Sequence, residues 1–235
     1  MPAQRRPRTE LGAEREFRGF GRVDQYDTED YENWLPLEAA NTVFKNEHEP
    51  PVLTRTWFHT GAMLRNEKIL RQYEQEYWYN RWNATKPDTP AQEEYQLPEA
   101  QIDSSVLEKT AMTAEEYREA LRACKGMVLR QEVFALDGTN QEKLPYTVAT
   151  HNCHIRMVQP RVNNAYASFL VLESEAITWN YERNPQDVRV GHTFNVEVDE
   201  FGNVRKAVSV VYPRRSDQKS VLPEYHYDYL TDLNK

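Results

Sequence analysis

The tetrapeptide His151-Asn152-Cys153-His154 holds residue types that bind zinc through nitrogen and sulfur. On an extended strand, His151 and Cys153 would share one face, and His154 would point away from them. The sequence contains no CxxC or HExxH motif that could supply the remaining ligands. We therefore interpret the tetrapeptide as structural, and we predict neither a metal site nor a cofactor.

Several carboxylates could in principle act as general acids or bases. Glu115-Glu116 opens a predicted helix, where negative charge favours the helix dipole. Glu173 and Glu175 would share a strand face, which is typical of a solvated surface. A tight turn explains Asp137-Gly138. No G-x-S-x-G or P-loop motif occurs, and no set of nucleophile, base and orienting group can be assembled. We therefore predict that the chain is not an enzyme.

An aromatic tract could form a ligand platform. Its members are Tyr73, Tyr77, Trp78, Tyr79 and Trp82. A stripe of this kind is more often the face of a helix packed on a sheet, and that interpretation is favoured here. The three tyrosines of the segment EYHYDYL, residues 224–230, leave the same two alternatives open.

The composition indicates sheets with one wet face. The 235 residues are 39% hydrophobic with a mean hydropathy of -0.85, but they include 14 Tyr, 8 Phe and 5 Trp. Aromatic side chains bury large areas, which compensates for the shortage of aliphatic residues. The net charge of -8 disfavours general nucleic-acid binding, which needs a positive surface.

The N-terminus lacks the apolar core of a secretory signal, and no apolar run approaches the length of a membrane span. We expect synthesis in the cytoplasm and no membrane insertion. The two cysteines, Cys124 and Cys153, do not make a disulfide framework. Two buried free thiols are favoured, and a single bridge stays open as an alternative.

The first half mixes strands and helices. Residues 1–14 are expected to form a disordered or unpaired tail. Strands are predicted over 15–29 and 52–61, an amphipathic helix over 62–82, and a Pro-containing surface loop over 83–111.

A second helix follows this loop. Thr113 is a good N-cap and Glu116, three residues later, completes a capping box. Gly126 is a plausible terminator. Residues 15–125 are therefore expected to form one strand–helix–loop–helix region.

Residues 126–213 are predicted to form an antiparallel meander of long hairpins, with the tail or further sheet over 214–235. In the stretch VGHTFNVEVD, alternate residues from Val190 to Val198 are expected to share one face. The expected turn residues are Gly19, Gly21, Asp137, Gly138, Asn184, Pro185, Asp199 and Gly202. The expected core residues are Trp57, Phe134, Trp179, Tyr181, Phe194 and Tyr212. The fold class is β-rich, with about two helices within residues 62–124.

Several segments together resemble a known family. They include EREFRGFGRVDQYDTE, VLTRTWFHTGA, CKGMVLRQEVFALDGT, PYTVATHNCHIRMVQP, ITWNYERNPQDVRVGH and VEVDEFGNV. In this order they resemble the middle/C-terminal region of the TcdB-like or SpvB-like B component of bacterial insecticidal toxin complexes. NYERNPQDVRVGHTFNVEVDEFGNV also resembles the tyrosine–aspartate (YD, or Rhs) repeat style. The chain looks like an excerpt of the full component.

The resemblance implies a function in enclosure. In this family the B and C components form a hollow β-shell around the cytotoxic part of the C component, and a β-propeller docks the shell to the pore-forming A component. The expected partners are the rest of the B chain and the C component, with indirect contact to the A component. The expected setting is extracellular, within a secreted complex. The alternative is a free-standing sheet module that binds carbohydrate or protein.

Overall fold

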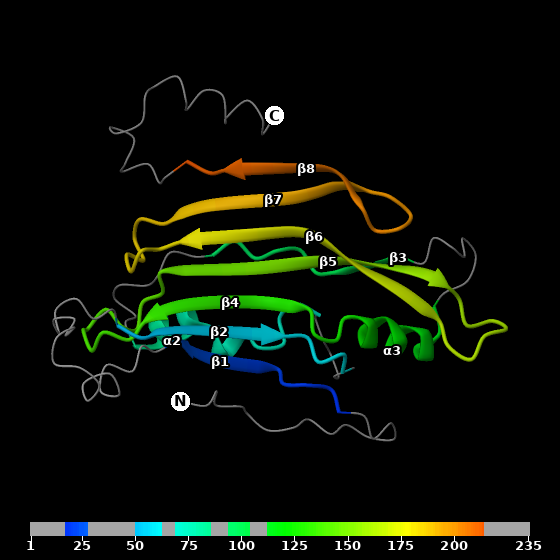
Figure 1. Ribbon diagram of the computed structural model, residues 1–235, viewed down its shortest axis with the longest axis horizontal. Coiled ribbons are helices and arrows are strands. Elements are labelled where there is room, and N and C mark those ends of the chain that lie inside the picture. Colours follow the sequence, from blue (N-terminus) through cyan, green and yellow to red (C-terminus); the bar gives the residue numbers. More distant parts are fainter. Residues whose placement is uncertain (1–16, 28–49, 63–68, 86–93, 104–111, 214–235) are drawn as a thin grey trace, which may run out of the picture.

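The computed structural model describes residues 17–27, 50–62, 69–85, 94–103 and 112–213. The expectations for residues 1–14 and 214–235, including the segment EYHYDYL, lie outside these ranges. The described residues have the alternating apolar pattern that favours strands, and they form an open sheet (Figure 1).

Within the described residues the sheet has eight strands, seven of them in the order β1-β2-β4-β5-β6-β7-β8, and every neighbouring pair in this order is antiparallel. The strands are β1 (Arg22–Asp27), β2 (Val52–Phe58), β3 (Gln101–Asp103), β4 (Val128–Ala135), β5 (Thr147–Gln159), β6 (Ser168–Asn180), β7 (Arg189–Val198) and β8 (Val204–Val211). β3 pairs parallel with β5. From β4 onward the strands follow one another as the predicted meander, so the predicted β-rich fold class is confirmed.

The part of the chain that the structure describes has three short helical elements beside the sheet: η3 (Glu74–Glu76), α2 (Trp78–Thr85) and α3 (Ala114–Ala123). The Thr113 side chain accepts a hydrogen bond from the Glu116 backbone amide, and the Glu116 carboxylate accepts one from the Thr113 amide. This reciprocal pair is the predicted capping box, and it fixes where α3 begins.

The helix predicted over 62–82 is confirmed from Trp78 onward and is wrong over residues 69–77. Residues 69–77 contain only the 3₁₀ turn η3, and α2 begins at Trp78. Tyr77 is extended, with φ -69° and ψ 149°, and the Trp78 amide donates 2.9 Å to a Glu132 carboxylate oxygen on β4. Tyr77 and Trp78 are both buried, which requires two successive side chains to enter the core and breaks the helical period.

The surface loop predicted over 83–111 is also wrong in part. α2 continues to Thr85, β3 adds a strand beside β5, and the side chains of Glu94 and Leu97 are buried. The proline-containing sequence correctly indicated an irregular path. It gave no sign that this path crosses the sheet and contributes to the core.

The strand register divides the side chains between two faces. Residues paired directly across antiparallel strands point to the same side of a sheet. One row runs from Trp57 through Arg130 and Thr150 to Ile177 and His192. We call this side the covered face, because Ile69, Leu70, Tyr77, Trp78 and Leu97 pack with its apolar members in one core. The helix α3 packs against β6 elsewhere in the sheet.

The sheet changes character at β7 and β8. The register shifts between Asn195 and Glu197, so Val196 is bulged out and is 64% exposed. The alternation expected from Val190 to Val198 is therefore interrupted at this bulge. Seven of the eight residues of β8 are exposed. Among the described strands β8 is an edge, on the opposite side of the sheet from β1 (Figure 1).

Candidate functional site

Charged side chains lie on the covered face, where apolar ones are usual. Arg130 and Glu132 on β4 have the same strand parity as buried Phe134. Arg55 on β2 lies between Leu53 and Trp57 on the same face. Charged residues almost never become fully buried unless they are paired, so their partners define the site.

The centre of this site is the Arg130 cluster, which comprises Arg130, Glu94, Glu132, Trp78 and Tyr181. The Arg130 guanidinium donates to Glu94 at 2.7 and 3.2 Å and to Glu132 at 2.8 Å. Arg130 is 1% exposed and Glu132 is 0% exposed. One cation therefore holds two carboxylates in the core, and one of them comes from the irregular segment that crosses the sheet.

Aromatic donors complete the Arg130 cluster. The indole nitrogen of Trp78 donates to Glu94 at 3.0 Å, and the Tyr181 hydroxyl donates to the same carboxylate at 2.8 Å. The Arg130 guanidinium lies 4.5 Å from the centre of the Tyr77 ring. The carboxylates thus join β4, β6 with its following turn, α2 and residue 94 in a single network.

The electrostatics follow from burial and pairing. Burial raises the pKa of the Glu132 carboxyl, against the opposing charge of Arg130. Burial acts to lower the pKa of Arg130, but the charges of Glu94 and Glu132 outweigh it and the pKa is raised. Burial also raises the pKa of the Tyr181 hydroxyl. The Arg130 guanidinium thus stays charged and the Tyr181 hydroxyl stays protonated, and both donate hydrogen bonds to the carboxylates.

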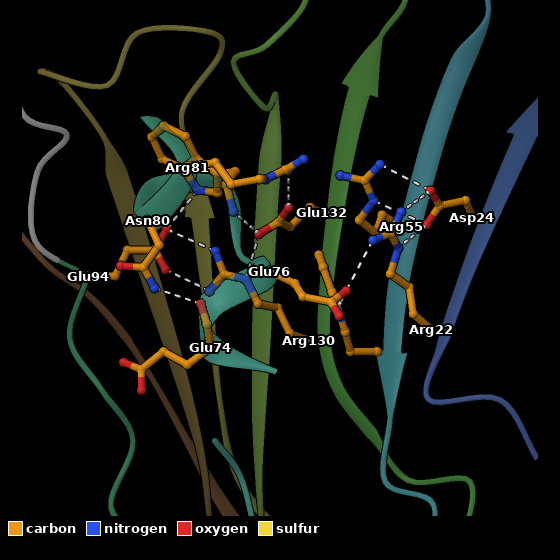
Figure 2. Close-up of polar contacts among 12 residues, drawn as sticks. Arg22, Asp24, Arg55, Glu74, Glu76, Asn80, Arg81, Glu94, Arg130 and Glu132 are labelled. Atoms are coloured by element: carbon orange, nitrogen blue, oxygen red, sulfur yellow. Dashed lines mark hydrogen bonds and ion pairs between the residues drawn. The ribbon is translucent and has the colours of Figure 1, made fainter. Parts of the chain in front are cut away.

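A second network lies beside the first on β1 and β2. The Asp24 carboxylate accepts from Arg22 at 2.8 and 2.7 Å and from Arg55 at 3.1 and 3.0 Å. Arg22 also reaches Glu76 of η3 at 3.1 Å. Burial opposes ionisation of Asp24, but the hydrogen bonds from Arg22 and Arg55 outweigh it and lower its pKa to about 2. This network attaches η3 to the first two strands (Figure 2).

A third polar contact stands nearer to β8. The His192 ring is 4% exposed, with Nε2 3.0 Å from a Glu175 oxygen and Nδ1 3.0 Å from the Tyr212 hydroxyl. The Phe194 ring centre lies 3.8 Å from that of His192. His192 therefore links β7 to β6 and to the residue that follows β8.

The expected core residues fall into two groups. Trp57, Phe134, Trp179 and Tyr181 are at most 4% exposed. Phe194 is partly buried. Tyr212 is 43% exposed, contrary to the expectation of burial, because it follows the exposed strand β8 and only its hydroxyl reaches inward to His192.

The expected turn residues lie in connections. Gly19 precedes β1, and Asp137-Gly138 lies in the long connection from β4 to β5 rather than in a two-residue hairpin. The Asp137 carboxylate is held by Arg183 at 2.6 and 2.9 Å. Asn184-Pro185 lies between β6 and β7, and the Asn184 side chain accepts from the Gln186 amide.

Two glycines have specific reasons to be glycine. A Cβ on Gly21 would collide with the Tyr73 hydroxyl. Gly202 has φ +92°, and a Cβ there would lie 3.1 Å from Leu172. In the same turn, the Asp199 carboxylate accepts from the amides of Phe201 and Asn203. Side-chain capping of this kind stabilises a tight turn.

The tetrapeptide 151–154 has separate local roles for its members. The His151 Nδ1 lies 2.6 Å from Glu173, and Cys153 is buried near Cys124. Within the described residues, no three His, Cys, Asp or Glu side chains come together in a way that could hold a metal ion. In the same part of the chain, no helix has the length and apolar character needed to cross a bilayer.

Sequence reasoning missed the buried charges, although a signal was present. Trp57 and Phe134 were expected in the core, and period-two alternation places Arg55, Arg130 and Glu132 on the face of those two aromatics. Glu94 carried no such signal, because its position depends on how an irregular segment crosses the sheet.

Comparisons with known proteins agree with this geometry. Residues 119–232 match the family model of the insecticide toxin TcdB middle/C-terminal region. A crystal structure of TcdB2-TccC3 matches 94% of this chain with 27% identity and a TM-score of 0.68, and the chain covers 10% of that chain. The chain is similar in sequence and fold to the Tc toxin B components. The resemblance predicted from the sequence is confirmed.

Two further structures extend the Tc toxin comparison. TcdB2-TccC3 without its hypervariable C-terminal region matches 94% of this chain at 26% identity and a TM-score of 0.69, over 9% of that chain. A Photorhabdus luminescens Tc holotoxin pore matches 89% at 26% identity and a TM-score of 0.63, over 8% of that chain. This chain thus spans about a tenth of the solved chains. No curated protein matches it at a significant level.

Proposed function

We propose that the chain is a non-enzymatic wall segment of a Tc toxin B component, helping to build the hollow shell that encloses the cytotoxic part of the C component. Its partners are the rest of the B chain and the C component, and indirectly the A component. The setting is extracellular, in a secreted complex. The support is the family match together with the likeness to chains solved as TcdB2-TccC3 and as a holotoxin pore.

The observation that carries the proposal is the exposed strand β8. Val204, Val208 and Val211 are 50%, 47% and 74% exposed, and Tyr212 beyond them is 43% exposed. An exposed apolar edge strand is a template for pairing with another strand, and soluble proteins usually blunt such edges. In a wall segment this edge would pair with a neighbouring strand, which would continue the sheet.

The polar groups of the described residues fit the same role. The Arg130 cluster has a cation, two carboxylates and aromatic donors, but its groups are buried and bond to one another, apart from one Glu132 oxygen that has no hydrogen bond. A catalytic site instead needs a nucleophile or base within reach of a substrate. The arrangement supports a rigid panel, in which charges tie the crossing segment and α2 to the strands.

A chimeric toxin component tests the proposal. Residues 17–213 replace the matching segment of TcdB2, and the chimera is expressed with TccC3. We expect a soluble complex that elutes at the size of TcdB2-TccC3 and protects the C-terminal part of TccC3 from added protease. Failure of the chimera to associate with TccC3, while a control carrying TcdB2's own segment does so, would overturn the proposal.

A matched pair of edge variants sharpens this test. Val208→Asp places a charge on exposed β8, and Glu200→Ala changes the exposed turn that precedes it. We expect Val208→Asp to reduce assembly of the chimera at least tenfold, whereas Glu200→Ala leaves it unchanged. Equal assembly by both variants would show that β8 is not a joining edge.

A further inference from the structure

Two cysteines far apart in the sequence meet in the core. Cys124 is the C-cap of α3, and Cys153 lies in the middle of β5. Both are free thiols, 1% and 2% exposed, and both belong to the same apolar core. Both thiols border the same surface hollow, and interaction with the Cys153 thiol raises the pKa of Cys124, so the two side chains are neighbours.

This pair connects parts of the fold that share few other bonds. α3 is held by its contacts with β6 and by backbone amides, such as that of Ala167, which donates to Glu119 at 2.8 Å. At the C-terminal end of α3, the Cys124 thiol donates to Ala120 of its own helix. A covalent link from Cys124 to β5 would fix that end to the sheet.

A hollow on the surface leads to the two thiols. Both cysteines line it, together with Lys125, Met127, Gln131, His151 and Glu173. The His151–Glu173 contact stands at this hollow, on the same face of β5 as Cys153. The sulfur atoms are thus buried, but they border a surface depression from which an oxidant can approach.

We propose that Cys124 and Cys153 form a disulfide when the protein meets an oxidising thiol–disulfide environment, and that this bond fastens the end of α3 to β5. Glutathione disulfide is the oxidant class we name. One protein thiolate attacks it, releasing glutathione and leaving a mixed disulfide. The second protein thiol then loses its proton and attacks the protein sulfur, releasing the second glutathione. Two thiols are oxidised and one disulfide is reduced.

Closure needs the two neighbouring sulfur atoms to approach each other, because a disulfide has a sulfur–sulfur length of about 2 Å. Hydrogen bonding to Cys153, burial and the charge of an ionised Cys153 all raise the pKa of Cys124. Bond closure is therefore expected to be slow at neutral pH and to accelerate as the pH rises.

The inference goes beyond the proposed wall function, which it uses only to explain why the protein leaves a reducing compartment. The bond closes a loop of about 30 residues, a length for which cross-linking stabilises a fold appreciably. A thiol pair of this kind would leave the chain adaptable during synthesis and stiffen it after export.

The test uses the 235-residue chain alone. The folded protein, and separately the reduced unfolded protein during refolding, is incubated with glutathione disulfide and then alkylated under denaturing conditions. We expect a monomer about 2 Da lighter, no alkylation, and a melting temperature raised by about 10 °C that reverts on reduction. Two alkylated thiols per chain after both routes would overturn the proposal.

Single variants separate this bond from other oxidation products. Cys124→Ser and Cys153→Ser each leave one thiol, and we expect neither to gain thermal stability from oxidation. A gain in either variant, or a bond found only between chains, would also overturn the proposal. The result does not depend on toxin assembly, so it can fail while the wall function stands, and the reverse also holds.

Discussion

The covered face and the β8 edge distribute polar and apolar residues in opposite ways. Around β4, the charged Arg130 and Glu132 are buried and paired, at 1% and 0% exposure. Along β8, valines are exposed, and Val211 reaches 74%. In an isolated globular domain we would expect the reverse in both places. The charges of the covered face pair with one another within the chain. The valines of β8 instead stay exposed and can contact a partner outside the described residues.

This contrast separates two kinds of stabilisation. Buried ion pairs contribute little net stability over an apolar replacement, but breaking one leaves an uncompensated charge in the core. Exposed valines contribute little until another strand covers them. Substitutions of the buried charges should therefore lower the free energy of unfolding. Substitutions on β8 should change only the association of this edge with a partner.

Removing the central cation should give the largest effect. Arg130→Met leaves Glu94 and Glu132 buried without their shared partner, and we expect a loss of about 3–5 kcal/mol in the free energy of unfolding. Urea denaturation measures it. The matched control is Arg205→Met, whose side chain is 63% exposed and 3.4 Å from Asp199, with an expected loss below about 0.5 kcal/mol. Similar losses of unfolding free energy for both variants would show that the buried and exposed ion pairs do not differ in importance.

Acid should destabilise the fold through the buried His59. This side chain is 1% exposed, its Nδ1 accepts from the Gly61 amide at 2.9 Å, and burial lowers its pKa to about 4. The unfolded chain protonates near pH 6.5, so stability is present above that pH and is lost as the pH falls toward 4. The expected loss is about 3 kcal/mol.

His59→Asn provides the matched variant for this pH dependence. Asn retains an acceptor for the Gly61 amide but does not titrate. We expect the free energy of unfolding of the variant to change by at least 2 kcal/mol less than wild type between pH 6.5 and pH 4. Parallel pH curves would show that another group is responsible for acid sensitivity.

The same Val→Ala substitution at two positions compares the buried core with the exposed β8 edge. Val148→Ala empties a fully buried position on β5, with an expected loss of about 2 kcal/mol from burial and cavity formation. Val211→Ala removes the same atoms from an exposed position on β8, with an expected change within about 0.5 kcal/mol. Thermal denaturation measures both, and a loss at Val211 comparable to that at Val148 would place β8 within the folded core.

The smallest effect on stability is expected at the edge itself. Val208→Lys should change the free energy of unfolding by less than about 0.5 kcal/mol, because the site is already 47% exposed. Concentration-dependent association of the chain should nevertheless decrease, since an edge lysine opposes strand addition. Sedimentation velocity over a range of concentrations tests this, and unchanged association would locate the contact elsewhere.

Local patterns in the sequence were sufficient to predict most of the sheet. The alternation of apolar and polar residues, together with the turn residues, predicted the strands β4 to β8. The Thr113–Glu116 spacing predicted where α3 begins. These features depend on neighbours a few residues away. The break at Tyr77 and Trp78 could not be predicted in this way, because it depends on the Glu132 carboxylate, which lies more than fifty residues further along the chain.

The candidate site was predictable only in part. Alternation with Trp57 and Phe134 implied that Arg130 and Glu132 face inward, but polarity alone suggested a solvated face. Glu94 was beyond prediction, because its contact with Arg130 requires knowing that residues 94–103 cross the sheet. A charge in the core becomes recognisable once its counterion is known, and that counterion lies 36 residues away.

The turn between β7 and β8 folds back over earlier strands. The Asp199 carbonyl accepts from Arg156 on β5 at 3.0 Å, and Gly202 lies close to Leu170 and Leu172 on β6. The last hairpin is therefore pinned at its tip, and β8 cannot swing freely about its own turn. A strand that paired with β8 would therefore run in a direction fixed by contacts to β5 and β6. The curvature of the extended sheet would then depend on Gly202 and Arg156.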